Sequence, residues 1–396
     1  LSEGRLKLTA ERANSVRGRI AARGDLHASV TAFNQAGGEL SSEGALMLEA
    51  DSLDNRSGGL VSADGNLTVS ARRIDNRAGE IAGPGQVTLD VAEQLDNRGG
   101  KAIGDSGLRL AAPRVLNQDG GVLASRDGLR LNGAELFNGN GGLLSSQQSI
   151  DVILDGVLGN QAGSLSSQGR LSVKSGRLDN QGGAVSSAGT LSLSSQGALN
   201  NQGGRVVTDA GAVLRSASLD NSQGGIVSAK GAAEIRTGSL NNSQKGGIGS
   251  GAGLALVADL VDNSQNGRIT AKGALDANLK GLDQQGSGRL VSDTAIALDL
   301  RGGELVNRAQ GLIATPGTLL LRQLGMVDNS GGEISSDRAF TLTTSALTNQ
   351  GGRLRSGGVL TLRIAQALDN SLEGVLSGTG GLDIRALALD NRSGSI

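Results

Sequence analysis

The sequence predicts an all-β protein, a parallel β-helix (β-solenoid) with about 19 coils of about 21 residues each. Two observations predict it: one motif returns at a nearly constant interval, and apolar residues occupy every second position within each copy. The clearest copy spans residues 178–193 and reads LDNQGGAVSSAGTLSL. Alternation in steps of two is typical of short strands with one buried face, and intervals of 20 to 50 residues are typical of solenoids.

An asparagine after Leu-x marks each copy, and we call it the anchor. The chain has 19 anchors, and their mean interval is about 20.9 residues. The first two are Asn14 and Asn34, and the last six are Gln284, Asn307, Asn329, Asn349, Asn370 and Asn391. Between them lie the anchors of the most regular copies, Asn55, Asn76, Asn97, Asn117, Asn138, Asn160, Asn180, Asn201, Asn221, Asn242 and Asn263.

We expect these regular anchors to form a structural ladder. Equivalent residues of adjacent coils in a β-solenoid lie one strand spacing apart, about 4.8 Å. An inward-turned amide at that spacing can donate to and accept from the amide of the next coil, and it can bond the turn backbone. The predicted role is architectural, and we expect no catalytic residue among the anchors.

Composition narrows the function classes. The chain has 65 glycines and three prolines, as many tight turns require, and a formal net charge of −1 with mixed signs, which does not favour a nucleic-acid partner. Cysteine is absent, which excludes disulfides and thiol chemistry. The sequence has no run of 18 apolar residues, so no transmembrane helix is predicted. No metal site, cofactor site or cofactor is predicted.

We expect residues 1–396 to form a single repeat array, an uncapped fragment of a longer chain. The copies in residues 1–33 are the loosest, with Ala13 and Ala32 at the usual leucine site and the only histidine, His27, which we expect on the solvated surface. Irregular coils are expected near 138–160 and 280–329. In the first, Gln148-Ser149 replaces a turn glycine and predicts a bulge; in the second, Pro316 is expected in a turn.

Three successive copies carry Asp-Asn-Arg, which predicts a short arginine row beside an aspartate row. The arginines are Arg56, Arg77 and Arg98. Such a row could bind an anionic glycan or a phosphate. The other interpretation is a solvated face on which the two rows neutralise each other.

Other repeat folds and functions fit less well. Twenty-one residues cannot hold the two helices of a tetratricopeptide or ankyrin unit, and leucine-rich repeats need the spacing Leu-x-x-Leu-x-Leu. Polysaccharide lyases are β-helices too, but they have long loops, whereas this chain has short turns and neither Trp nor Tyr. We therefore expect no enzyme. A calcium-binding β-roll would need Gly-Gly-x-Gly-x-Asp, and an ice-binding solenoid would need threonine ladders.

The copy at 53–71 also resembles the haemagglutinin repeat of filamentous haemagglutinin and related exoproteins, including contact-dependent growth inhibition toxins. The likeness covers essentially the whole chain. It implies a right-handed β-helix rod, secreted to the cell surface of a Gram-negative bacterium by an outer-membrane two-partner transporter. The secretion-signal domain and the toxin domain of such proteins are not matched.

The resemblance implies a structural stalk of a large adhesin or contact-dependent toxin, which projects functional domains from the cell and acts in virulence. The alternative is a binding module within the filament, in which the Arg56, Arg77 and Arg98 row or the coils at 280–329 contact glycans or receptors on a host or target cell.

Overall fold

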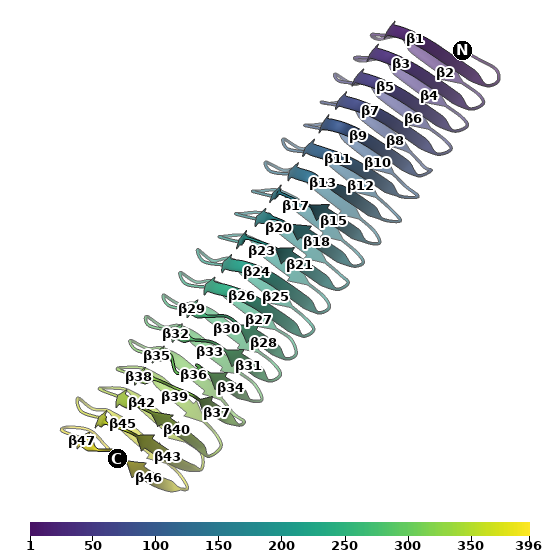
Figure 1. Cartoon of the computed structure of the whole chain (residues 1–396). Coiled ribbons are helices and arrows are strands. Elements are labelled where there is room, and N and C mark those ends of the chain that lie inside the picture. The colour runs from purple at the N-terminus through teal and green to yellow at the C-terminus, as the bar shows by residue number, and fades with distance from the viewer. The chain divides into compact units, whose positions relative to one another are not determined.

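The computed structural model describes all residues from 1 to 396 and contains strands and no helix. Parallel strands stack as a β-solenoid of about 18 turns of about 21 residues, which confirms the predicted fold class. The chain divides into two compact units, Leu1–Gly197 (unit 1) and Ala198–Ile396 (unit 2). Within each unit, every coil contributes one long strand and one short strand (Figure 1).

In unit 1 the short strands form one parallel ladder and the long strands form another. The short strands are β2 (Arg19–Ala22), β4 (Glu39–Ser42), β6 (Leu60–Ala63), β8 (Glu80–Gly83), β10 (Lys101–Gly104), β12 (Val122–Ser125), β14 (Leu143–Ser146), β17 (Ser164–Ser167) and β20 (Ala184–Ser187). The unbroken long strands are β1 (Leu6–Asn14), β3 (Leu26–Asn34), β5 (Leu46–Asp54), β7 (Leu67–Asp75), β9 (Val87–Asp96), β11 (Leu108–Leu116) and β13 (Leu129–Phe137).

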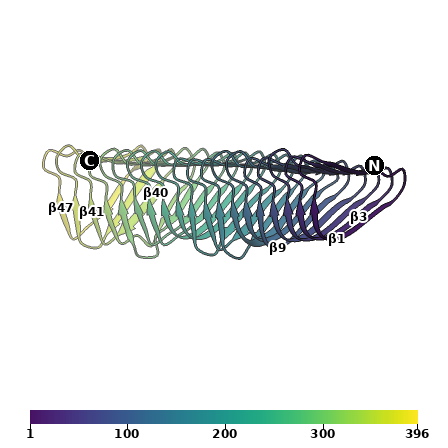
Figure 2. The ribbon, with the colours of Figure 1, turned by 90° about the horizontal axis from the view of Figure 1, so that it is seen from above.

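The last long strands of unit 1 are interrupted at a bend: β15 (Ile150–Leu154) with β16 (Val157–Gly159), β18 (Leu171–Ser175) with β19 (Arg177–Asp179), and β21 (Leu191–Ser195). Seen from above, the turns between strands line up from coil to coil within each unit (Figure 2).

Unit 2 repeats this plan with mostly interrupted long strands. Its short strands are β23 (Arg205–Thr208), β25 (Ile226–Ala229), β27 (Gly247–Ser250), β30 (Arg268–Ala271), β33 (Arg289–Ser292), β36 (Leu312–Thr315), β39 (Glu333–Ser336), β42 (Arg353–Ser356) and β45 (Val375–Gly378). Two long strands are unbroken, β24 (Ala212–Asp220) and β26 (Ala233–Asn241).

The first halves of the interrupted strands of unit 2 are β28 (Leu254–Val257), β31 (Leu275–Asn278), β34 (Ile296–Asp299), β37 (Leu319–Arg322), β40 (Phe340–Thr344), β43 (Val359–Ile364) and β46 (Gly381–Arg385). The second halves are β22 (Ala198–Asn200), β29 (Leu260–Asp262), β32 (Gly281–Asp283), β35 (Glu304–Val306), β38 (Met326–Asp328), β41 (Ala346–Thr348), β44 (Ala367–Asp369) and β47 (Ala388–Asp390).

The core lies between the two strands of each coil. In the coil of β5 and β6, Leu46, Leu48, Leu53 and Val61 are at most 2% exposed. Leu46 pairs with Leu26 before it and with Leu67 after it, so identical rows of leucine stack through the core. Burying such side chains stabilises by about 1.5–3 kcal/mol each, and a coil gains this only when neighbours cover it above and below.

The anchors of the first two coils differ from the prediction. Asn34 pairs with Asp54, so it lies one position before the anchor, and Asn14 pairs with Asn34. Their Oδ1 atoms accept from the backbone N–H two residues on, as the aspartate at this position does in later coils. The prediction that Asn14 and Asn34 are anchors is therefore wrong.

Gln35 is the anchor of the second coil, and its Nε2 donates to Asn55 Oδ1 at 3.0 Å. The leucine site of these coils is held by Ala13 and Phe33, which pair with each other, and not by Ala32. Phe33 in turn pairs with Leu53 and is 1% exposed. A phenylalanine here fills the space that alanine at the same site in the first coil leaves open.

The extra residues of irregular coils lie at the bend of the long strand. In the coil 138–160, Leu154 pairs with Gly133 and Leu158 pairs with Leu136, so the added residue lies between Leu154 and Leu158. It lies inside the coil 138–160 that we expected to be irregular, but not at Gln148-Ser149. In the coil after Gln284, four residues (300–303) separate β34 from β35, where two separate β31 from β32.

Candidate binding surface

The anchors form a continuous chain of side-chain hydrogen bonds inside each unit. In unit 1, Nδ2 of Asn55 donates to Oδ1 of Asn76 at 2.7 Å, and the same contact recurs at 2.7 Å through Asn97, Asn117, Asn138, Asn160 and Asn180. In unit 2 it links Asn201, Asn221, Asn242 and Asn263 at 2.7–2.8 Å. All eleven side chains are 0% exposed.

Each anchor amide also bonds the backbone. Nδ2 of Asn55 donates to the carbonyl of Gly59 in its own turn and to that of Glu80 in the next coil, both at 3.1 Å. The amide is thus shielded from solvent, and its hydrogen bonds are all made within the protein. It has no capacity left for a ligand, which leaves the anchors a structural role.

Glutamine replaces asparagine at one anchor of unit 2 without interrupting the chain. Gln284 accepts from Asn263 Nδ2 at 2.9 Å and donates to Asn307 Oδ1 at 3.3 Å. The second contact is longer than those between asparagines, and the coil that follows is the longest between two anchors. The ladder then continues at 2.7 Å through Asn329, Asn349, Asn370 and Asn391.

Most of the turn glycines that follow the anchors lie against the preceding coil. A Cβ atom on Gly163 would be 1.9 Å from the carbonyl oxygen of Asn138, and one on Gly183 would be 2.1 Å from that of Asn160. Any other residue would push the coils apart. The glycine repeat therefore reflects close stacking of the corner turns.

The three arginines of the predicted row are each paired inside their own coil. The contacts are Arg56 Nε to Asp54 Oδ2 at 3.2 Å, Arg77 Nη2 to Asp75 Oδ2 at 2.7 Å, and Arg98 Nη2 to Asp96 Oδ2 at 2.7 Å. Arg77 also lies 3.7 Å from Asp96 of the next coil. The two rows are interleaved, so this face offers an anion little uncompensated positive charge.

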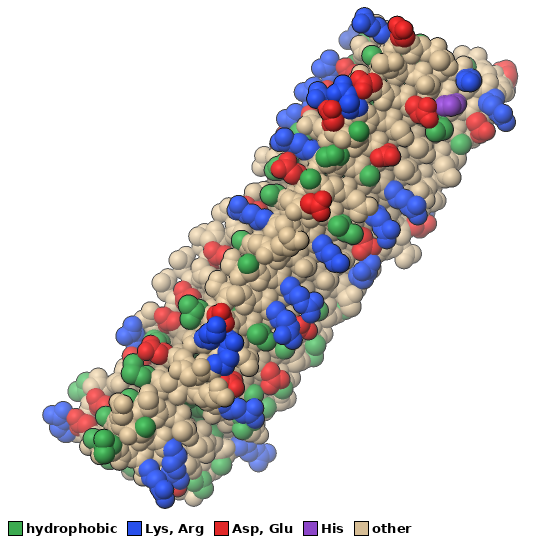
Figure 3. Space-filling view, viewed as in Figure 1, with side chains coloured by type: hydrophobic (Ala, Val, Ile, Leu, Met, Phe, Trp, Pro, Cys, Tyr) green, Lys and Arg blue, Asp and Glu red, His purple; other side chains and the backbone are tan.

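The electrostatics of the row agree with this geometry. Burial acts to raise the pKa of Asp75, but the hydrogen bonds and charge of Arg77 outweigh it and hold that pKa below its usual value. The same pairing raises the pKa of Arg77. On the visible face, acidic and basic side chains are interspersed in both units (Figure 3).

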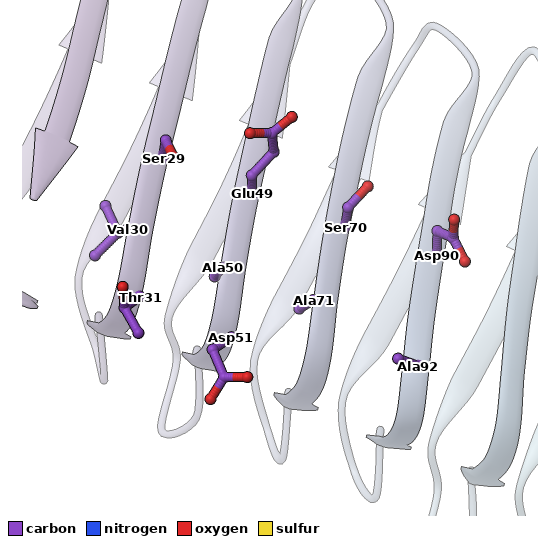
Figure 4. A pocket seen from close by; sticks show the side chains of 10 residues that line it. All are labelled: Ser29, Val30, Thr31, Glu49, Ala50, Asp51, Ser70, Ala71, Asp90 and Ala92. Carbon is purple, nitrogen blue, oxygen red and sulfur yellow. The ribbon is translucent and has the colours of Figure 1, made fainter. Parts of the chain in front are cut away.

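A shallow groove of about 540 Å³ crosses the outer face of β3, β5, β7 and β9 in unit 1. The side chains of Ser29, Glu49, Ser70 and Asp90 follow one another on these successive strands (Figure 4). They offer hydroxyl and carboxylate oxygens as hydrogen-bond acceptors. The surface is open, and no nucleophile and base lie paired within it.

Sequence reasoning missed an ion cluster beside this groove. Arg72 donates from Nε to Asp51 Oδ1 at 2.7 Å and from Nη1 to Glu93 Oε1 at 2.9 Å, and Arg73 also bonds Glu93. Glu93 lies at a β-bulge, where two residues of β9 face Arg72 alone. The signal was present: Asp51 and Glu93 lie 21 residues before and after Arg72.

The only histidine, His27, lies on the surface, as we expected. The His27 side chain is 44% exposed, and its Nε2 lies 3.8 Å from Glu49 Oε2. No group of three or more His, Asp or Glu side chains is placed to hold a metal ion. The structure contains no helix with the length and hydropathy needed to span a lipid bilayer.

The family comparison covers the whole chain. The model of the haemagglutinin repeat matches residues 1–55, 41–99, 85–161, 151–203, 204–278, 262–371 and 365–396. The comparisons with curated proteins and with solved structures return no match. Successive matches overlap by part of a coil, except at residues 203 and 204, where they adjoin. The chain therefore belongs to the haemagglutinin-repeat family.

Proposed function

We propose that residues 1–396 form one repeat array that acts as a structural stalk in a large surface-exposed or secreted bacterial exoprotein. The observation that carries this is the uniformity of the contacts: the same amide ladder, turn glycine and leucine rows recur from coil to coil. A specific site needs a constellation that occurs once. A uniform array supplies length and stiffness instead.

The parent protein in this proposal is an adhesin or a contact-dependent growth inhibition toxin of a Gram-negative bacterium, and recognition or toxicity resides outside these coils. Its partner during export is an outer-membrane two-partner transporter. Nearest-neighbour stacking supports this route, because each coil can fold on the previous one without distant contacts.

The test is a deletion that keeps the register in the full-length parent protein. Removing residues 118–160 excises two coils and joins Asn117 to the turn that normally follows Asn160. If the coils act as a stalk, the deletion variant should remain folded and displayed, and its adhesion or toxin delivery should be largely intact. Loss of adhesion or delivery by a displayed, folded variant would contradict the stalk.

A matched control is the deletion of residues 118–149, which removes one and a half coils. It places Ile150, a residue that is buried at the start of a long strand, directly after an anchor. This variant should misfold, which shows that the register of the coils and not the mere loss of residues matters.

The alternative is a binding module that uses Arg56, Arg77 and Arg98. The triple change to glutamine distinguishes the two proposals, because it removes the guanidinium groups and leaves the buried coil unchanged. The stalk proposal expects unchanged binding to host or target cells. Lost binding by the folded, displayed variant would favour the binding module.

A further inference from the structure

The long-strand ladder of unit 2 is interrupted at one place. β34 pairs with β37, but β40, β43 and β46 form a separate three-stranded sheet. On the other sides of the same coils, β36 pairs with β39 and β38 pairs with β41. Strand pairing is therefore interrupted between β37 and β40, which still lie next to each other, while the coils remain paired elsewhere.

Apolar side chains lie on the outer face at this interruption, where Leu320 and Val359 alternate with the buried Leu319 and Leu360. A slot of about 270 Å³ is lined by Leu319, Leu320, Leu321, Phe340 and Val359 together with neighbouring small and polar residues. Leu320 and Val359 are 42% and 41% exposed. Leu321 is half-buried, although Leu298, its partner in the preceding coil, is 0% exposed. The volume is below that of typical small-molecule pockets and suits a single apolar side chain.

The same unit carries a complementary projection. Leu372 lies in the corner turn after anchor Asn370 and is 64% exposed. Its φ is +51°, and it is the only large apolar residue among the non-glycine residues with positive φ. The equivalent position after Asn263 is Gln265, also at φ +51°. A leucine held in a left-handed conformation in water is unfavourable in the isolated chain, and strain of this kind clusters at binding sites.

Charges beside the two features also match. Glu373 follows Leu372 in the turn and has no cation within ion-pair distance, and Arg322 at the rim of the slot has no carboxylate partner. The turn itself is ordered, because the backbone N–H groups of Leu372 and Glu373 donate to Arg392 and Ser393 of the next coil at 3.1 Å. The projection is thus an apolar tip next to a negative charge, and the slot is an apolar hollow next to a positive charge.

We infer that copies of this chain associate laterally, with Leu372 of one copy in the slot of another and Glu373 paired with Arg322. Projection and slot lie on different parts of the coil, a corner turn and the first half of a long strand. The contact is therefore heterologous, and each copy retains a free projection or a free slot after pairing. Association should continue beyond two copies.

Sedimentation velocity over a concentration series tests this with the whole chain. Leu372→Asn removes the projection and suits the left-handed turn, so it should preserve the fold while it weakens association by about tenfold or more. Leu320→Glu, at an exposed position, should block the slot. The matched control Gln265→Asn, at the equivalent turn position after Asn263, should associate like the unchanged chain.

Mixing the two variants gives the sharpest test. Each variant alone should associate at least about tenfold more weakly than the unchanged chain. The mixture should form a dimer that grows no further, because Leu372→Asn keeps the slot and Leu320→Glu keeps the projection. The double variant Arg322→Glu with Glu373→Arg should associate, whereas each single charge reversal should not. The inference fails if the unchanged chain is monomeric at every soluble concentration, if Leu372→Asn leaves association unchanged, or if the mixture yields no dimer.

Discussion

Nδ2 of Asn76 donates to Oδ1 of Asn97 at 2.7 Å, and both side chains are fully buried. Each coil contributes one amide to this chain, and each amide donates to one neighbour and accepts from the other. Removal of one member therefore affects two contacts at once.

Replacing Asn97 by leucine should lower the free energy of unfolding by about 2–4 kcal/mol. The change removes one of the acceptors of the buried Asn76 Nδ2, which keeps only the carbonyl of Lys101, and it removes the side-chain donor to the buried Oδ1 of Asn117. Urea denaturation followed by circular dichroism measures the loss. Asp90→Ala, on the exposed face of the neighbouring strand, is the control and should change stability by less than about 0.5 kcal/mol. Equal effects would mean that the ladder contributes nothing beyond an ordinary surface contact.

Replacing Gly163 by alanine should destabilise unit 1 by at least about 2 kcal/mol, because the added Cβ would be 1.9 Å from the Asn138 carbonyl. Gly128→Ala is the matched control, since a Cβ there meets its nearest neighbour at 3.6 Å. Thermal unfolding of the two variants should separate them clearly. If both melt like the unchanged chain, corner stacking tolerates a side chain and the glycine repeat needs another reason.

Replacing Ser15 by asparagine should stabilise the first coils by about 1 kcal/mol. Oε1 of Gln35 is buried and has no hydrogen-bond partner, and Ser15 holds the anchor position of the preceding coil. An asparagine at 15 can donate to it and extend the ladder by one member. Hydrogen exchange of the amides near residue 35 should slow. Ser29→Asn, on the outer face, should leave that exchange unchanged.

Acid should weaken the ion cluster around Arg72. Hydrogen bonds from Arg72 lower the pKa of Asp51 and of Glu93. A carboxylate with a lowered folded-state pKa stabilises the fold above its unfolded-state pKa, and that contribution disappears as the pH falls through the lower, folded-state value. The contribution should therefore be constant from pH 7 to about 5, begin to decline below about pH 4.5, and vanish only below the lowered folded-state pKa of the two carboxyl groups.

Arg72→Gln should bring the pKa of both carboxyl groups back towards ordinary values, and titration followed by nuclear magnetic resonance reads this directly. Arg56→Gln is the control, because Arg56 contacts a different carboxylate, that of Asp54. An unchanged pKa for Asp51 in Arg72→Gln would show that the cluster is not formed in solution.

Periodicity was sufficient to predict the coil, because an interval of about 21 residues and alternating apolar positions leave few folds that bury one face. It misplaced the first two anchors. At those positions Asn14 and Asn34 hold the aspartate site, where asparagine makes the same backbone contact, so residue type alone does not fix the phase. Phe33, which aligns with Leu53, was the signal that would have corrected it.

The bulge in β9 could not be predicted from anchor intervals. The coil from Asn76 to Asn97 has 21 residues, as the coil before it does, and the extra residue in the strand is offset elsewhere in the coil. The Arg56, Arg77 and Arg98 row followed from sequence, but its pairing with aspartate within each coil depends on side-chain rotamers. The interruption of strand pairing between β37 and β40 has no signal in the sequence other than the irregular length of the coils there.

The amide ladder has a direction. Every anchor donates towards higher residue numbers and accepts from lower ones. A chain that folds from its amino end therefore always presents a free donor at its growing tip, and the next anchor is oriented before its own successor exists. Assembly in that order is a polymerisation with fixed polarity. The number of coils can therefore change by duplication or loss of one repeat, because each new coil is still added through the same amide contact.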